Sequence, residues 1–217
     1  MSAAAQLVFP PHHGSDSALP AWREPTTPHP GAETAFRHFL QSLGLDTADP
    51  QLADTPARAA RAYAEIFAGL DEKTRPRLTT FPNAGSRTAM IVVAAKPFYS
   101  MCAHHFLPFF GRAHVGYVPG ERLLGLSKIA RALEYYARRP QVQERLTEQT
   151  ASVLMEESGA AGVVVLTEAR HLCMEMRGVS KSGAVTSTVA AHGVLEDPQR
   201  QQEFLERIRD ARSAAET

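Results

Sequence analysis

The chain has 217 residues, 44% of them hydrophobic, and its 23 basic and 23 acidic side chains leave no formal net charge. A neutral balance gives no electrostatic reason to expect binding to nucleic acid or to an anionic membrane. No apolar run approaches the roughly 20 residues of a membrane-spanning helix, no secretory signal is visible, and two cysteines do not make a disulfide scaffold. We therefore expect a soluble, cytoplasmic, globular protein.

The N-terminal part of the chain divides into a tail and a helical region. Residues 1–32 are rich in proline among small and polar residues, so they bury too little apolar surface to fold, and we predict a flexible tail. Residues 33–84 are predicted to be helical. Apolar residues at helical spacing start at Phe36, and the sequence Asp54-Thr55-Pro56 is typical of a second helix start.

Residues 85–217 show four strand-like and three helix-like segments. Residues 89–95 indicate a buried strand, and residues 112–118 alternate in polarity. Two helices follow, the first with Ser127 as a candidate N-cap and the second ending at Gly159. Strand character returns at 162–178 and at 184–194, before a last helix at about 198–211. Strands close in sequence favour antiparallel hairpins with the helix pair on one face, which is an α+β fold.

A candidate metal site comes from the two cysteines and their neighbours. Cys102 and His105 form a C-x-x-H pair, and Cys173 lies in "HLCMEMRG", with His171 on the same side of an extended chain. Two cysteines and one histidine with an open fourth position are typical of catalytic zinc. His104 and His171 lie beside these ligands and titrate near neutral pH, which suggests hydrolysis with proton transfer. The alternative is that both cysteines are small buried hydrophobes.

Three other histidines lie alone in periodic segments and are interpreted as surface or satisfied core residues: His38, His114 and His192.

A second group of residues indicates an anionic substrate. Lys128 and Arg131 lie at a helix start, where backbone N–H groups favour anions, and Arg177 follows the metal strand. Converging basic groups suit a phosphate-bearing substrate, and the alternative is a solvated basic face. No P-loop motif is present to hold the phosphates. Gln143 and Glu144 are either helix caps or the amide and carboxylate that the edge of a guanine requires.

Five motifs in order, "SMCAHHF", "GLSKIAR", "RRPQVQERLTEQ", "HLCMEMRGV" and "TSTVA", closely resemble the GTP cyclohydrolase I family. The resemblance runs from about Thr55 to near Arg209. It implies a tunnelling fold over residues 85–217, the catalytic domain: a four-stranded antiparallel sheet with two helices packed on one face, preceded by N-terminal helices. It also implies a toroidal homodecamer with active sites between subunits.

The same resemblance implies conversion of GTP and water to 7,8-dihydroneopterin triphosphate and formate, the first step of pterin and folate biosynthesis, with one Zn²⁺ per subunit. It assigns metal binding to three residues: Cys102, His105 and Cys173. It assigns proton transfer to His104 and His171, and opening of the ribose to Ser127. It assigns binding of the guanine edge to Gln143 and Glu144. It assigns binding of the triphosphate to four basic residues: Lys128, Arg131, Arg177 and Arg58.

The sequence departs from the family at one position. The family usually reads C-E-H-H, and this chain has Ala103 in place of that glutamate. A carboxylate there can orient a neighbouring histidine, and losses at such outer positions are roughly 10–100-fold. We therefore predict an active enzyme with an altered rate or pH profile. The alternatives are a related zinc enzyme that releases a ring-opened product from GTP, and a non-catalytic, zinc-stabilised paralogue.

Overall fold

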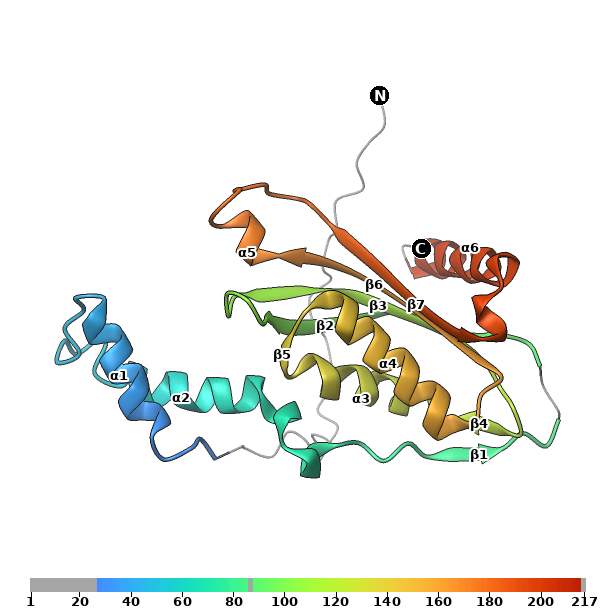
Figure 1. The fold of residues 1–217 in the computed structure, drawn as a ribbon, viewed down its shortest axis with the longest axis horizontal. Coiled ribbons are helices and arrows are strands. Elements are labelled where there is room, and N and C mark those ends of the chain that lie inside the picture. The colour runs from blue at the N-terminus through green and yellow to red at the C-terminus, as the bar shows by residue number, and fades with distance from the viewer. Residues whose placement is uncertain (1–26, 86–87, 216–217) are drawn as a thin grey trace.

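The computed structural model of the chain describes residues 27–85 and 88–215, and these residues form an antiparallel sheet covered by helices (Figure 1). Two hairpins make up the sheet, in the strand order β5-β2-β3-β6-β7. All pairs are antiparallel except β5 with β2. The bounds are β2 Ile91–Cys102, β3 Pro108–Val118, β5 Pro140–Gln141, β6 Gly162–His171 and β7 Thr186–Gly193. The predicted α+β class is therefore confirmed, with the two-residue strand β5 as an addition.

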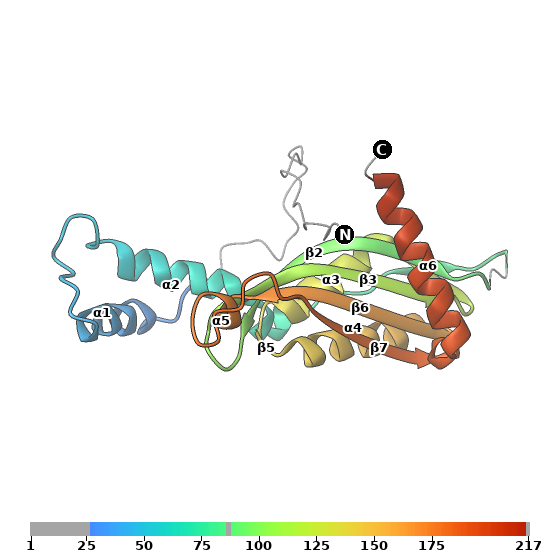
Figure 2. The ribbon, with the colours of Figure 1, turned by 90° about the horizontal axis from the view of Figure 1, so that it is seen from above.

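Helices cover both faces of this sheet (Figure 2). Helices α3 (Leu126–Ala137) and α4 (Gln143–Ser158) lie side by side on one face, as predicted, and α6 (Pro198–Ala215) crosses the other. Alternation along β3 explains the two layers, because Val115 and Tyr117 pack toward α3 and α4 while Val118 packs with Phe204 and Ile208 of α6. None of the helices in the described ranges has the length and apolar character needed to cross a bilayer.

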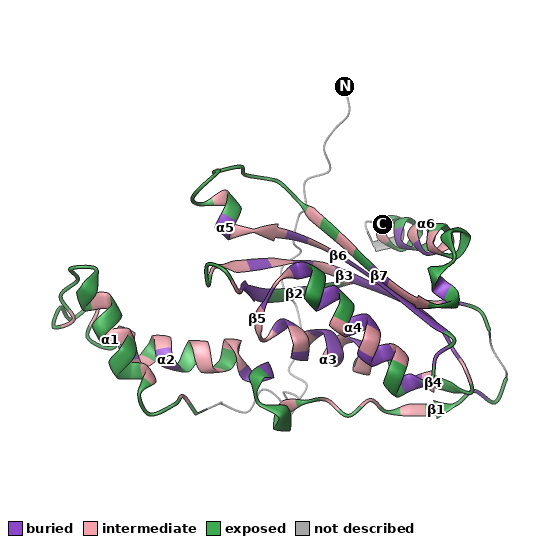
Figure 3. Cartoon of the chain, in the orientation of Figure 1, coloured by how far each residue is buried: buried purple, intermediate pink, exposed green. Residues whose placement is uncertain are grey.

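The N-terminal helices form an arm that extends from the body of the molecule (Figure 1). Helix α1 (Ala32–Ser42) packs on α2 (Thr55–Ile66), with the rings of Phe36 and Tyr63 5.1 Å apart. Few residues of this arm are buried (Figure 3). Two 3₁₀ turns, η2 (Ala68–Leu70) and η3 (Glu72–Thr74), then lead to β1 (Thr80–Pro82), which pairs with β4 (Arg122–Leu124).

Most of the predicted tail lies outside the described residues. The division of the chain at residues 32 and 84 stays a prediction.

Strand β2 is longer than predicted. The expected strand ended at residue 95, because Lys96 and Pro97 interrupt the apolar run. The structure places a bulge there: the pairing with β3 shifts between Val93 and Lys96, and Ala95 has a φ of 55°. The strand continues on the far side of the bulge with Phe98 buried. This extension carries Cys102 to the end of the sheet.

Two helix boundaries also bear on the site. Helix α3 starts at Leu126 with Gly125 in the cap position, so Ser127 lies inside the helix and is not its N-cap. The extended backbone of Gly125 takes the cap place that the sequence assigned to Ser127. Gly159 ends α4 in the left-handed conformation, with a φ of 64°, as predicted.

Candidate metal centre

The loop between β2 and β3 presents the first two predicted ligands. The backbone N–H of Phe106 donates to the carbonyl of Cys102 at 2.9 Å, which closes the loop. Phe106 has a φ of 51°, a strained value for a bulky residue, and its ring lies 5.5 Å from that of Phe67. In this loop the Sγ of Cys102 is 3.9 Å from Nδ1 of both His104 and His105.

The third predicted ligand lies on a short helix, which corrects the sequence interpretation. Strand β6 ends at His171, and Cys173 belongs to α5 (Leu172–Glu175), so these two residues do not lie on one side of an extended strand. The backbone N–H of Met176 donates to the carbonyl of Leu172 at 3.1 Å, since the chain reverses here instead of continuing as a strand. The turn directs Cys173 into the protein, where it is buried.

Together these elements make a three-ligand group. The ligand atoms of Cys102, His105 and Cys173 all lie within 4.8 Å of one another, and His105 is the exposed member. Two thiols and one imidazole are the donor set of zinc, and three protein ligands leave a position free for water or substrate. The donor chemistry therefore fits a zinc ion.

The charge environment at Cys173 has opposing contributions. Burial and the neighbouring Cys102 thiol raise the pKa of Cys173, whereas the guanidinium of Arg177 lowers it. A thiolate is the form that binds metal. The structure thus brings Arg177, predicted to bind phosphate, close enough to act on the metal ligands.

His171 is held by one ring contact and one hydrogen-bonding partner. Its ring is stacked on that of Phe109, with centroids 4.8 Å apart and planes within 1° of parallel. Its Nε2 lies 2.8 Å from Oε1 of Gln143. Burial lowers the pKa of His171, and the carboxylates of Glu144 and Glu175 oppose that shift. A half-buried imidazole with a fixed orientation suits proton transfer.

The side chain of Gln143 is buried and makes its hydrogen bonds within the protein. It is 2% exposed, and its Nε2 donates to the carbonyl oxygens of Thr167 and Thr186, each at 3.0 Å. Its Oε1 faces His171. The neighbouring Glu144 is exposed and free of such packing. The predicted contact of Gln143 with a guanine stays a prediction, and what the structure shows is support of His171.

An ion pair that the sequence analysis missed closes the turn between β6 and α5. The Nε and Nη2 of Arg170 lie 2.9 and 2.5 Å from the two carboxylate oxygens of Glu175. This contact lowers the pKa of Glu175. The only signal in the sequence was a pair of opposite charges flanking "HLCM", and their contact depends on the turn that the sequence did not reveal.

Three predicted site residues lie away from this group: Ser127, Lys128 and Arg58. Arg131 lies midway along α3. The C-terminal end of α3 adjoins the metal strand, because the Oγ of Ser100 donates to the carbonyl of Ala137 at 2.7 Å. Ser127 lies ten residues earlier, roughly 15 Å along the helix axis. Arg58 lies on the arm, 3.6 Å from Asp54. Within one chain, the three predicted metal ligands lie together, whereas Ser127 and Arg58 lie apart from them.

The fold and the ligand group define the class first: an α+β protein with a Cys-His-Cys group that fits a metal ion. Comparison with known proteins gives the family. The sequence model of GTP cyclohydrolase I matches residues 32–209. Proteins called GTP cyclohydrolase 1 from Bifidobacterium longum and Thermobifida fusca are 48% and 50% identical, covering 83% and 77% of this chain and 90% and 82% of theirs. The Mycobacterium marinum protein of that name is 51% identical over 76% of this chain and 82% of its own. The chain belongs to the GTP cyclohydrolase I family of enzymes.

A crystal structure of the archaeosine synthase QueF-Like in the apo form also matches, with a TM-score of 0.39 and 16% identity over 48% of this chain and 93% of that chain. A likeness of this size does not bear on function.

Proposed function

We propose that the protein converts GTP and water to 7,8-dihydroneopterin triphosphate and formate, with a zinc ion held by Cys102, His105 and Cys173. The single observation that carries the proposal is the convergence of these three ligand atoms within 4.8 Å, from a hairpin loop and a separate short helix. Membership of the GTP cyclohydrolase I family supports the substrate. When bound, such an ion supplies a Lewis acid and a water that is nucleophilic near neutral pH.

The imidazoles beside the ligands take the proton-transfer role. His104 is exposed and lies outside the three-ligand group, so its ring is available to move a proton at the reacting base. His171 is half-buried and held by Gln143 through its Nε2. One exposed and one half-buried, fixed imidazole suit a reaction in which protons are taken up and released at different atoms of one substrate.

The remaining substrate contacts point to a neighbouring chain. Ser127 and Lys128 lie in the first turn of α3 and Arg58 lies on the arm, away from the metal ligands of the same chain, and Arg131 lies midway along α3. We therefore propose that a second copy supplies them for opening the ribose and holding the triphosphate. This arrangement agrees with the predicted homodecamer with active sites between subunits. The tunnelling topology, the decamer and the cytoplasmic location stay predictions.

Product analysis tests the proposal. The purified full chain, loaded with zinc, is incubated with GTP, and products are identified by mass and by pterin fluorescence after oxidation, with formate measured separately. We expect formate and a neopterin triphosphate in equal amounts. Cys102→Ser should abolish both products, whereas His38→Ala, on the exposed face of α1, should leave them unchanged.

Other products of this assay would favour one of the two alternative functions, and Ala103 is the residue that raises them. Ala103 lacks the carboxylate that is usual in the family, but its backbone N–H donates to the carbonyl of Gln141 at 2.8 Å, so the start of the ligand loop is anchored without that side chain. We therefore expect GTP turnover, as predicted from the sequence, with the rate or pH profile as the property that Ala103 can alter. A ring-opened product would indicate an enzyme that stops after the first hydrolysis. Unchanged GTP with one zinc per chain would indicate a non-catalytic paralogue.

A further inference from the structure

The turn that carries Cys173 has little support of its own. Helix α5 is a single turn of four residues, too short to be stable in isolation. The chain that follows is exposed throughout residues 176–185. Cys173 packs into the core with Cys102 and Phe109, but its neighbour Met174 is 40% exposed. Something other than its own backbone must therefore hold this turn in one conformation.

The ion pair between Arg170 and Glu175 spans this turn from end to end. Arg170 is next to last in β6 and Glu175 is the last residue of α5, so the pair encloses His171, Cys173 and the residues between them. Two parallel contacts of 2.9 and 2.5 Å fix the planes of both groups. Two long side chains that meet in this way restrict the backbone between them far more than a single contact does.

Burial and anchoring separate this pair from an ordinary surface pair. The Glu175 side chain is 7% exposed, and a carboxylate so far removed from water requires a permanent partner. Arg170 pairs in the sheet with Phe110, and its guanidinium lies 5.9 Å from the centre of that ring. The clamp is therefore fixed to the sheet through Arg170, and its carboxylate is held out of water at Glu175.

We propose that Arg170 and Glu175 are positioning residues that clamp the turn between β6 and α5, so that Cys173 meets Cys102 and His105 before a metal ion arrives. The inference rests on the proposed metal centre and extends it, because neither residue is a ligand. A turn held in place beforehand loses less conformational entropy when the metal binds, so the clamp raises metal affinity. Breaking it weakens zinc binding without removing a ligand.

Metal affinity of the purified full chain tests this inference directly. Zn²⁺ affinity is measured by competition with a chromophoric chelator, and the Co²⁺-substituted protein is examined for its thiolate absorption bands. Glu175→Gln should bind Zn²⁺ about 10–100-fold more weakly than wild type. Arg170→Lys should weaken binding similarly, because a lysine keeps the charge but cannot make two parallel hydrogen bonds.

A matched control comes from another ion pair of the chain. Arg75 contacts Glu157 at 2.5 Å near the end of α4. Glu157 is fourteen residues from Gln143, roughly 21 Å along the helix axis. Glu157→Gln should leave Zn²⁺ affinity within twofold of wild type. Weaker binding in Glu175→Gln alone, with Arg170→Lys unchanged, would mean that the charge of the carboxylate matters and the clamp does not, which overturns the proposal.

A double variant in which the two residues are exchanged distinguishes loss of the clamp from loss of the fold. If a single variant unfolds at the assay temperature, the double variant Arg170→Glu/Glu175→Arg restores opposite charges across the same turn. Affinity within about threefold of wild type then supports the clamp, and affinity as weak as in the single variants overturns it. Wild type that binds zinc but leaves GTP unchanged would reject the proposed function alone. Wild type that binds no zinc would reject both.

Discussion

Adjacent residues of β6 belong to two polar networks on opposite faces of one sheet. Thr167 points toward α4, where its hydroxyl lies 2.8 Å from those of Thr147 and Thr188 and where Gln143 and His171 continue the contacts. We call these five residues the amide network. Glu168 points the other way, toward α6.

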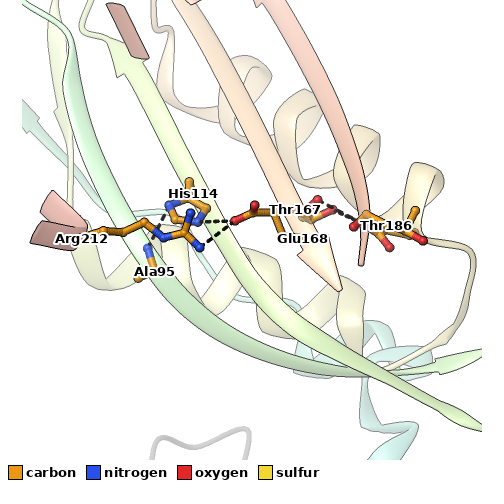
Figure 4. A network of polar contacts seen from close by, with 7 residues as sticks. Ala95, His114, Thr167, Glu168, Thr186 and Arg212 are labelled. Atoms are coloured by element: carbon orange, nitrogen blue, oxygen red, sulfur yellow. Dashed lines mark hydrogen bonds and ion pairs between the residues drawn. The ribbon is translucent and has the colours of Figure 1, made fainter. Parts of the chain in front are cut away.

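The second group, the carboxylate network, consists of His114, Glu168 and Arg212 (Figure 4). One oxygen of Glu168 lies 3.3 Å from the His114 imidazole and 3.3 Å from the Arg212 guanidinium. His114 is fully buried, and its Nδ1 accepts a hydrogen bond from the N–H of Ala95, in the bulge of β2. The network therefore joins β2, β3 and β6 to the C-terminal helix.

The two networks differ in charge and in where they end: the amide network ends beside the metal ligands, and the carboxylate network ends beneath the C-terminal helix. The amide network contains no carboxylate or cation, and it ends at a half-buried histidine beside the metal ligands. The carboxylate network contains full charges and ends beneath a helix. His171 is half-buried and lies beside the metal ligands, which suits proton transfer, whereas His114 is fully buried and out of reach of a substrate.

The largest effect is expected when one of the three metal ligands is removed. Cys173→Ala deletes one of three ligands, so bound zinc should be lost and GTP turnover should fall by more than the roughly 100-fold seen for outer residues of metal sites. Zinc content per chain and product formation measure this. Met174→Ala, at the exposed neighbouring position, should keep both. Full zinc occupancy in Cys173→Ala would contradict the ligand assignment.

A smaller effect is expected inside the amide network. Gln143→Leu removes the partner of His171 and the amide hydrogen bonds to the carbonyls of Thr167 and Thr186, which should lower the unfolding free energy by about 1–3 kcal/mol. The turnover number should fall about 10–100-fold, because His171 loses its orientation, while KM changes little.

Steady-state kinetics and chemical denaturation measure the two effects of Gln143→Leu. Thr188→Val is the control within the same network, since it removes a part-buried hydroxyl without touching the partner of His171. It should lower stability and leave the turnover number unchanged. A higher KM with an unchanged turnover number in Gln143→Leu would instead favour the guanine contact predicted from the sequence.

The sequence predicted the parts of this molecule that depend on local spacing. Cys102 and His105 are three positions apart, and their ligand atoms lie close together, as the C-x-x-H pattern predicted. The hairpins and the helix pair followed from periodicity and short connections. Gly159 ended α4 as predicted, because the backbone takes the left-handed conformation there and glycine adopts it most easily.

What the sequence could not predict depends on register and turns. Glu168 reaches His114 because β3 and β6 pair with Arg112 opposite Glu168, and no local pattern fixes that register. The reversal after His171 placed Cys173 on a helix, and it also created the contact between Arg170 and Glu175. The position of Ser127 relative to the metal ligands of the same chain depends on how α3 packs against β2, so it emerged only from the structure.

The carboxylate network should carry the smallest effect, limited to stability. The His114 imidazole, and then the Arg212 guanidinium, hold the pKa of Glu168 below its ordinary value of 4.5, while burial opposes them and Arg112 adds to the lowering. A depressed pKa in the folded state stabilises the fold above the unfolded pKa, and this contribution is lost as pH falls through the folded value. The stabilisation should therefore be complete at pH 7 and decline below about pH 4.5.

Glu168→Gln should lower the unfolding free energy by about 1 kcal/mol at pH 7, between the values for exposed and buried ion pairs. Because glutamine does not titrate, the gap between variant and wild type should narrow as the pH falls below about 4.5. Denaturation curves from pH 7 to pH 3.5 measure it, and GTP turnover at pH 7 should stay within twofold of wild type. A gap that is constant with pH would show that the charge of Glu168 does not stabilise the fold. A loss of turnover as large as that expected for Gln143→Leu would show that the two faces of the sheet are coupled, and the contrast between the networks would then fail.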